Sequence, residues 1–383
     1  MVKCPWRSCG ARTRECPRED NADLGFHFLL RYMLRKLKLA TLGALRAGGA
    51  FHLVRESRWR RNRLLILCYH GVALADEHLW RPRLYVPPDV LEQRFEILKR
   101  GGYSVLGLDE GLRKLQSGEL PARSVVLTFD DGGYDFYKVA RPLLRKYGFP
   151  ATVYQTTYYS DYQAPIFNLM CSYLLWQRRG QMLDKGRELA LEQPMDLRTE
   201  LSRHRIVRVF VERAEAEDLT GRRKNEIARQ LAKLLDVDYD ALCAKRLLHI
   251  MSREEVAELI AEGFDVQLHT HRHRTPENET LFRKEIQDNR KSLPDVAKSA
   301  QHFCYPSGVY RDPFIPWLQA ENVVSATTCD VALATRKSNP WLLPRFIDTA
   351  VRTDVEFESW LSGVGDLLAF RRAATQQYIP DRD

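Results

Sequence analysis

The stretch Ser124-Val-Val-Leu-Thr-Phe-Asp-Asp-Gly132 joins an apolar run to two adjacent carboxylates and a glycine. The run at 124–129 has the length and composition of a buried strand. Strands that are apolar on both faces are typical of parallel sheets. In such sheets, catalytic groups collect at the C-terminal ends of the strands, which is where Asp130 and Asp131 stand.

Outward from this stretch, apolar runs alternate with segments of helical spacing. We predict strands at 64–69, 103–106, 151–155, 264–268, 301–305, 323–327 and 341–346, and helices at 88–100, 109–116, 134–147, 252–261, 279–293 and 354–372. Repeated strand–helix units imply an α/β fold with a parallel sheet, either closed as a barrel or open. The rhythm breaks at about 160–249, where Arg, Glu and Leu at helical spacing predict an inserted helical subdomain.

The formal net charge of +9 is concentrated before residue 64. Residues 1–63 hold 15 Lys or Arg against 5 Asp or Glu, so residues 64–383 carry −1 in total. A nucleic-acid groove needs basic charge on the folded domain, so we expect no nucleic-acid partner. The chain therefore divides into a basic N-terminal segment, 1–63, and a domain at 64–383.

Leucines alternate with basic residues from Met33 to Arg63, and ten Lys or Arg lie between Arg31 and Arg63. This pattern is typical of a basic amphipathic helix on an anionic membrane surface. A solvated helix packed on the domain is the alternative. No apolar run has the ~20 residues of a spanning helix, and no secretory signal pattern opens the sequence. We expect a cytoplasmic protein, peripheral on the inner face of the membrane through residues 31–63.

Three of the eight cysteines, Cys4, Cys9 and Cys16, follow the spacing C-x4-C-x6-C, and the others are scattered. That spacing matches no common zinc pattern. We expect free, reduced thiols, with a metal or redox role of the first three as the alternative.

A second polar cluster, His269-Thr-His-Arg-His273, follows the strand predicted at 264–268. Histidines four residues apart can reach one ion from a tight bend. His271 joins them only if the strand continues, because alternation then places all three on one face. Adjacent carboxylates repel each other and usually flank a cation. We therefore expect a metal site, although one aspartate of the pair capping a helix is the alternative for the pair alone.

Both clusters resemble motifs of the polysaccharide deacetylases with a NodB-homology domain (carbohydrate esterase family 4). T-F-D-D-G stands unbroken at 128–132, and H-[ST]-x-x-H stands at 269–273. The resemblance covers roughly residues 64–350 outside the insertion, and it implies a distorted (β/α)7 barrel. It also implies a divalent metal, expected to be Zn²⁺, held by Asp131, His269 and His273, with Asp130 as the general base.

The family's third motif, R-x-P-[YF]-G, is altered here. It reads Cys304-Tyr-Pro-Ser-Gly308, so the arginine that holds the base in the family is missing. Arg345 is the candidate replacement, and pairing with a structural acid is its alternative role. By position, the backbone N–H of Ser307 serves the oxyanion.

The family's C-terminal leucine-x-x-histidine motif is also missing, but Leu67-Cys-Tyr-His70 supplies that pattern near the start of the domain. This placement resembles the circularly permuted branch of the family, in which His70 is the general acid. A histidine that caps a turn is the alternative.

The resemblance implies a hydrolase of carbon–nitrogen bonds that removes N-acetyl groups from a polysaccharide, oligosaccharide or lipid-linked saccharide. Removal of O-acetyl groups is the nearest variant. The rival hypothesis is a catalytically weakened sugar-binding or membrane-surface protein, which only the missing arginine supports. An amidohydrolase with an H-x-H pair at His269 and His271 is disfavoured, because that pair usually lies on the first strand of the barrel.

Overall fold

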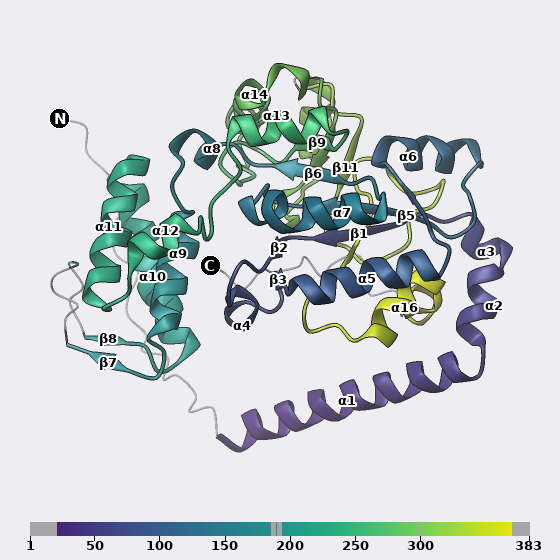
Figure 1. Ribbon diagram of the computed structural model, residues 1–383, viewed down its shortest axis with the longest axis horizontal. Coiled ribbons are helices and arrows are strands. Elements are labelled where there is room, and N and C mark those ends of the chain that lie inside the picture. The colour runs from purple at the N-terminus through teal and green to yellow at the C-terminus, as the bar shows by residue number, and fades with distance from the viewer. Residues whose placement is uncertain (1–20, 185–188, 190–193, 298, 370–383) are drawn as a thin grey trace, which may run out of the picture.

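The computed structural model describes residues 21–184, 189, 194–297 and 299–369. Its centre is a parallel half-barrel sheet in the order β11-β10-β9-β6-β5-β1-β12, with β4 paired to β5 (Figure 1). The strands are β1 (Leu65–Tyr69), β4 (Ser104–Leu106), β5 (Ser124–Phe129), β6 (Thr152–Gln155), β9 (Asp265–Leu268), β10 (His302–Cys304), β11 (Ser325–Thr327) and β12 (Phe346–Ile347). A parallel bridge between Thr327 and Leu343 brings the segment before β12 against β11, so the sheet curls towards closure. The expected α/β fold is confirmed.

The central strand β5 is buried along its whole length. It pairs with β1 on one side, and β4 and β6 share its other edge. In the β1–β5 register, Tyr69 lies opposite Phe129. The two strands therefore end together, and their next residues, His70 and Asp130, emerge side by side.

Four helices that cover the sheet lie at nearly the predicted positions: α5 (Pro88–Arg100), α6 (Leu108–Ser117), α13 (Arg253–Ala261) and α14 (Glu279–Ser292). The helix predicted at 134–147 is a π-helical turn, Phe136–Ala140, followed by α7 (Arg141–Tyr147), and α15 (Phe314–Ala320) was not predicted. The single helix predicted at 354–372 is wrong. It is divided into α16 (Asp354–Ser362) and α17 (Val364–Leu368) by Gly363, whose φ of 92° is left-handed. A side chain at Gly363 would also meet the Trp59 ring, 2.7 Å away. Residues 370–372 lie outside the described chain.

The insertion forms a helical subdomain beside the barrel (Figure 1). It contains α8 (Tyr158–Tyr162), α9 (Phe167–Gln177), α10 (Glu200–Ala216), α11 (Gly221–Leu234) and α12 (Tyr239–Ala244). It also contains a short antiparallel pair, β7 (Met182–Leu183) and β8 (Met195–Asp196), which the helical spacing did not indicate. Two-residue strands are too short to leave an alternating pattern.

A second small sheet lies between β1 and α5. It pairs β2 (Gly71–Val72) with β3 (Tyr85–Val86), and α4 (Glu77–Trp80) connects them. Tyr85 belongs to the apolar core of the inserted subdomain. This sheet therefore links the barrel to the insertion.

The N-terminal segment contains α1 (Asn21–Ala47), α2 (Ala50–Glu56) and α3 (Arg58–Arg61). Leu42 and Phe51 pack with Val364 against the barrel. Arg60 is fully buried and donates to the carbonyl oxygens of Leu361, Arg63 and Ser124. For α2, α3 and the end of α1, the structure therefore shows the packed alternative.

The first part of α1 differs, because the side chains of Met33 and Leu37 are 60% and 64% exposed. Among the helices of the described residues, none is long and apolar enough to cross a membrane. The first three cysteines lie outside the described residues: Cys4, Cys9 and Cys16. The cysteines in the described part of the chain are free thiols.

Candidate active site

The structure brings the three predicted metal ligands together. Asp131 Oδ1 lies 3.2 Å from the Nε2 atom of His269 and 3.2 Å from that of His273. His269 is buried, whereas the side chain of His273 is 41% exposed, so the cluster opens to solvent on the His273 side. One carboxylate oxygen and two imidazole nitrogens form the donor set of a catalytic zinc site.

Left-handed backbone conformations aim these ligands. Asp131 has a φ of 70° and His273 a φ of 54°, values that are uncommon for non-glycine residues but more accessible to Asp and His than to most others. Gly132 follows with a φ of 75°, and a Cβ atom there would lie 2.2 Å from Oε1 of Gln155. The glycine of the T-F-D-D-G motif is thus required both by its backbone angle and by the close side chain.

The His269 ring is oriented by its neighbours. Its Nδ1 lies 2.8 Å from the carbonyl oxygen of Cys304, which can only accept, so Nδ1 carries the proton. In the neutral ring, Nε2 then directs a lone pair towards Asp131, as a metal ligand requires. The His269 N–H donates to Oδ1 of Asn289, whose Nδ2 donates to the Gln155 carbonyl. The fixed orientation of the His269 ring, with Nε2 directed towards Asp131, fits a divalent cation between these side chains. Asn289 was missed, because nothing in a helical sequence marks which polar residue faces the strand ends.

Asp130 is held by Arg345. The guanidinium donates from Nη1 to Oδ1 and from Nη2 to Oδ2, both at 2.7 Å, and both side chains are buried. Burial by itself would raise the pKa of Asp130, but the charge and hydrogen bonds of Arg345 outweigh it and hold that pKa well below its usual value. The carboxylate is therefore ionised. Of the two alternatives for Arg345, the structure shows the contact with Asp130.

Two buried thiols also contact this carboxylate. The Sγ atoms of Cys68 and Cys304 lie 3.5 Å and 3.4 Å from Asp130 Oδ2. Burial raises the pKa of both thiols well above the usual value, so they remain protonated donors. Cys304 stands where the family has its arginine, and its Sγ lies 3.1 Å from Arg345 Nη2. Arg345, which immediately precedes β12, thus reaches Asp130 beside the smaller Cys304 at the end of β10.

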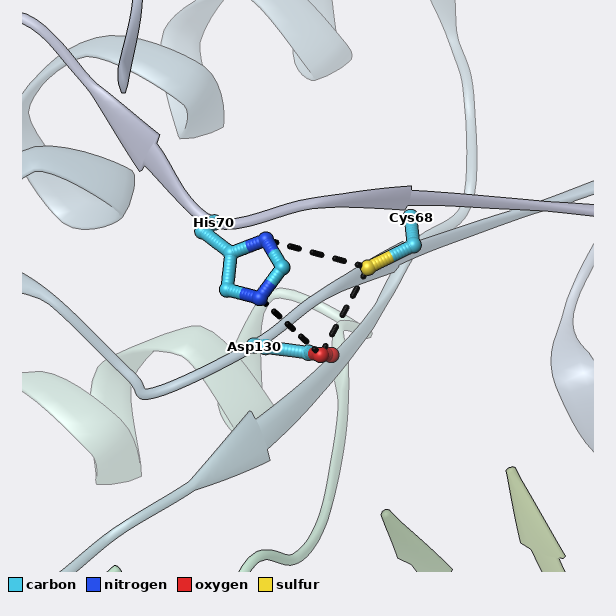
Figure 2. A group of neighbouring side chains, drawn as sticks. All are labelled: Cys68, His70 and Asp130. Atoms are coloured by element: carbon cyan, nitrogen blue, oxygen red, sulfur yellow. Dashed lines mark hydrogen bonds and ion pairs between the residues drawn. The ribbon is translucent and has the colours of Figure 1, made fainter. Parts of the chain in front are cut away.

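His70 lies beside Asp130, with its Nε2 atom 3.7 Å from Oδ2 and its side chain 20% exposed (Figure 2). His271 does not join the cluster. Its Nδ1 is bonded to Oγ1 of Thr157 at 2.9 Å. The left-handed φ of 61° at Thr270 ends the strand, so the three histidines do not share one face.

Ser307 lies in the turn after β10, between Pro306 and Gly308, and has a left-handed φ of 55°. Its position follows Cys304, which contacts Asp130. Its service to an oxyanion stays a prediction.

A pocket opens beside Asp130, Asp131 and His70, with about 440 Å³ of empty space that includes open solvent. The inserted subdomain forms one wall, through the apolar residues Ile166, Leu169, Leu248 and Ile250. Backbone bonds tie this wall to the ligand turn. The Tyr134 N–H donates to the His249 carbonyl at 2.8 Å, and the Met251 N–H donates to that of Gly132 at 3.0 Å.

Asp135 also lines this pocket, and the sequence analysis did not predict it. Burial raises its pKa to about 7, although a hydrogen bond from the Val72 N–H opposes the shift. Its side chain also fills the space beside Gly133.

Part of this chain is similar to known proteins. Residues 117–191 match the family model for polysaccharide deacetylases. The poly-beta-1,6-N-acetyl-D-glucosamine N-deacetylase of Escherichia coli K12 is 31% identical over 100 residues, which are 26% of this chain and 15% of that protein. The match thus spans a small part of the relative.

Two solved structures are similar at low identity. The Streptococcus pyogenes deacetylase PplD in complex with acetate is 21% identical, with a TM-score of 0.49, and the likeness covers 76% of this chain and 93% of that one. IcaB from Ammonifex degensii is 16% identical, with a TM-score of 0.48, over 79% and 97%. The family match contains the T-F-D-D-G motif, and the second motif meets it at the neighbouring strand ends. Residues 117–191 are therefore similar to the polysaccharide deacetylase family, and this segment carries the two adjacent aspartates of the site.

Proposed function

We propose that this protein is a metal-dependent hydrolase that removes N-acetyl groups from a carbohydrate. The observation that carries the proposal is the pairing of an ionised, arginine-held Asp130 with the adjacent cluster of Asp131, His269 and His273. The contact between Arg345 and Asp130 speaks against the catalytically weakened alternative, because that alternative rested only on the missing arginine at Cys304.

The residues divide the work as follows. Asp131, His269 and His273 would hold a divalent ion, expected to be Zn²⁺, which would supply Lewis acidity towards an acetyl carbonyl and water. Asp130 accepts the proton of the attacking water, and Arg345 keeps its carboxylate oriented. The Ser307 N–H donates to the developing oxyanion. His70, on the open side of Asp130, gives a proton to the departing amine.

Acetate release tests the proposal directly. We expect the purified full chain to release acetate from N-acetylated saccharides, to stop after treatment with chelator, and to recover with Zn²⁺. The panel should run from chitin oligomers to lipid-linked saccharides, with O-acetylated sugars as a separate arm. Binding of sugars without acetate release from any member would favour the weakened scaffold instead.

The His70 prediction concerns the pH profile. We expect His70→Ala to lower kcat by about 10²–10⁴-fold, the usual contribution of a general acid or base. The variant should also lose the alkaline limb of the pH–rate profile, because the group that gives its proton to the departing amine is removed. His271→Ala is the matched control, because His271 bonds to Thr157. Unchanged kinetics in His70→Ala would assign the acid to another residue.

We also propose that the first part of α1 rests on an anionic membrane, with the domain on its inner face. Exposed apolar residues lie there beside three basic ones: Tyr32, Met33, Leu34 and Leu37 beside Arg35, Lys36 and Lys38. Arg35 also donates to the Val351 carbonyl and Lys38 pairs with Glu356, so both would have to leave the domain to reach a leaflet. Such a helix combines apolar insertion with about 1 kcal/mol per basic residue near an anionic leaflet.

Vesicle co-sedimentation tests the membrane proposal. A truncation at Leu64 is unsuitable, because it removes the buried Arg60 and Phe51. We expect the full chain to sediment with anionic but not neutral vesicles, and to be released by salt. Met33→Ser/Leu37→Ser should abolish sedimentation, whereas Leu281→Ser, an equally exposed leucine on α14, should not. A full chain that stays in the supernatant at low salt contradicts the proposal.

A further inference from the structure

Cys68, His70 and Asp130 bring three different donor atoms together (Figure 2). Asp130 directly precedes Asp131 of the ligand triad. Cys68 Sγ lies 3.5 Å from Asp130 Oδ2 and 4.0 Å from His70 Nδ1. His70 Nε2 lies 3.7 Å from the same carboxylate oxygen. None of the three residues belongs to the triad, so they form a second cluster of donors.

Backbone pairing holds this cluster in place. Cys68 lies opposite Thr128 in the β1–β5 register, and the Asp130 N–H donates to the Tyr69 carbonyl at 2.9 Å. Cys68 and Asp130 are buried, whereas His70 is partly exposed and leaves a path for an ion. The donors therefore stand on two rigid, neighbouring strand ends.

A sulfur, an imidazole nitrogen and a carboxylate oxygen are ligands that zinc uses. Bonds of about 2.3 Å to sulfur and about 2.0–2.1 Å to nitrogen or oxygen place neighbouring tetrahedral donors roughly 3.3–3.6 Å apart. The sulfur–oxygen separation of 3.5 Å already lies in this range. The two His70 distances belong to different ring nitrogens, and with one nitrogen per ring the three donor atoms lie within 4.8 Å of one another, so the partly exposed His70 side chain must rotate towards the ion. Sulfur also makes this cluster softer than the triad, which favours Zn²⁺ or Cd²⁺ over Mg²⁺ or Ca²⁺.

Arg345 opposes a cation here. Its guanidinium already donates two hydrogen bonds to Asp130, so an ion must share that carboxylate with a positive charge. Asp131 in the triad has no such bond from an arginine among the described residues. The second cluster is therefore the weaker of the two and fills after the triad.

We propose that Cys68, His70 and Asp130 form a second, inhibitory site for a soft divalent cation. The cation bonds to the Cys68 sulfur, whose proton is released to solvent, and to one oxygen of Asp130 and one nitrogen of His70. The inhibition depends on the proposed roles of Asp130 and His70 as base and acid. The binding of a cation does not depend on those roles.

Cadmium titration tests the site through its sulfur. A thiolate bound to Cd²⁺ gives an ultraviolet charge-transfer band, and the triad has no sulfur. The full chain should carry Cys4→Ser, Cys9→Ser and Cys16→Ser, so that these thiols contribute nothing. We expect the first equivalent of Cd²⁺ to bind without the band, the second to produce it, and Zn²⁺ to compete it away.

Single substitutions separate the two sites. Cys68→Ser should lose the band and keep the first equivalent. Cys304→Ser is the matched control. Its thiol also contacts Asp130, but it groups with His269 and not with His70. His269→Ala should lose the first equivalent and keep the band, so failure of the catalytic metal site is distinguishable from failure of this one.

Absence of the band in the parent chain, or a band that survives Cys68→Ser, overturns the site. If Cys68→Ser does not fold, His70→Ala replaces it and should need at least about tenfold more Cd²⁺ to produce the band. The inhibitory part has its own readout. Acetate release should fall as Zn²⁺ exceeds one equivalent, and inhibition that persists in a variant lacking the band overturns that part.

Discussion

His269→Ala and Asp131→Ala should each abolish acetate release and leave the purified chain without its divalent ion. A site with three protein ligands rarely survives the loss of one. His269 is also the most constrained ligand, since its ring and its backbone N–H are both held by hydrogen bonds. Metal content after dialysis, measured beside acetate release, checks the prediction.

A graded series makes this test sharper. Asn289→Ala removes the acceptor of the His269 N–H without touching a ligand, so we expect metal affinity to fall by about 10–100-fold, the usual effect of an outer-shell change. His271→Ala should keep the ion, because its ring is bonded to Thr157. Full metal occupancy in His269→Ala would show that the ion lies elsewhere.

Asp130→Asn should keep the ion and lose activity by about 10²–10⁴-fold, because the amide cannot accept the proton of the attacking water. The variant should also be less stable, since Arg345 remains buried without its anionic partner. Leaving one member of a buried ion pair costs about 3–5 kcal/mol. Metal content, kcat and thermal unfolding report the three effects separately.

A second substitution distinguishes catalysis from stability. Asp130→Asn/Arg345→Met removes the uncompensated charge, so the melting temperature should recover while activity stays low. Recovery of activity with stability would show that Asp130 acts only through folding. Arg345→Met alone should lose less activity than Asp130→Asn, because the carboxylate remains but is no longer held by two hydrogen bonds.

The local features of the site followed from short stretches of sequence. The run at 124–129 predicted β5, and the contiguous residues after it predicted the carboxylate pair at its end. His269 and His273 were predicted as ligands because they lie four positions apart in one loop. Functional residues at a strand end and in the turn after it could therefore be predicted from the sequence.

The boundaries that failed depended on packing. The helix breaks at Gly363, whose left-handed φ leaves no room for a side chain against the Trp59 ring, 304 residues earlier in the chain. The exclusion of His271 depended on a single left-handed residue, Thr270. A helical or alternating pattern carries no information about either, because both arise where separate elements meet.

The sequence by itself determined the parallel α/β architecture, the ligand types and their places at strand ends, since these depend on hydrophobic period and on adjacent residues. Only the tertiary structure decided what surrounds Asp130. Arg345 reaches it across 215 residues and Cys68 across 62, through the register of β12, β1 and β5. The tertiary structure also decided that the insertion walls the pocket and that α2 and α3 pack on the barrel. Contacts of this kind depend on which strands and helices lie side by side in the folded protein. The spacing of apolar residues along the sequence does not show which elements become neighbours.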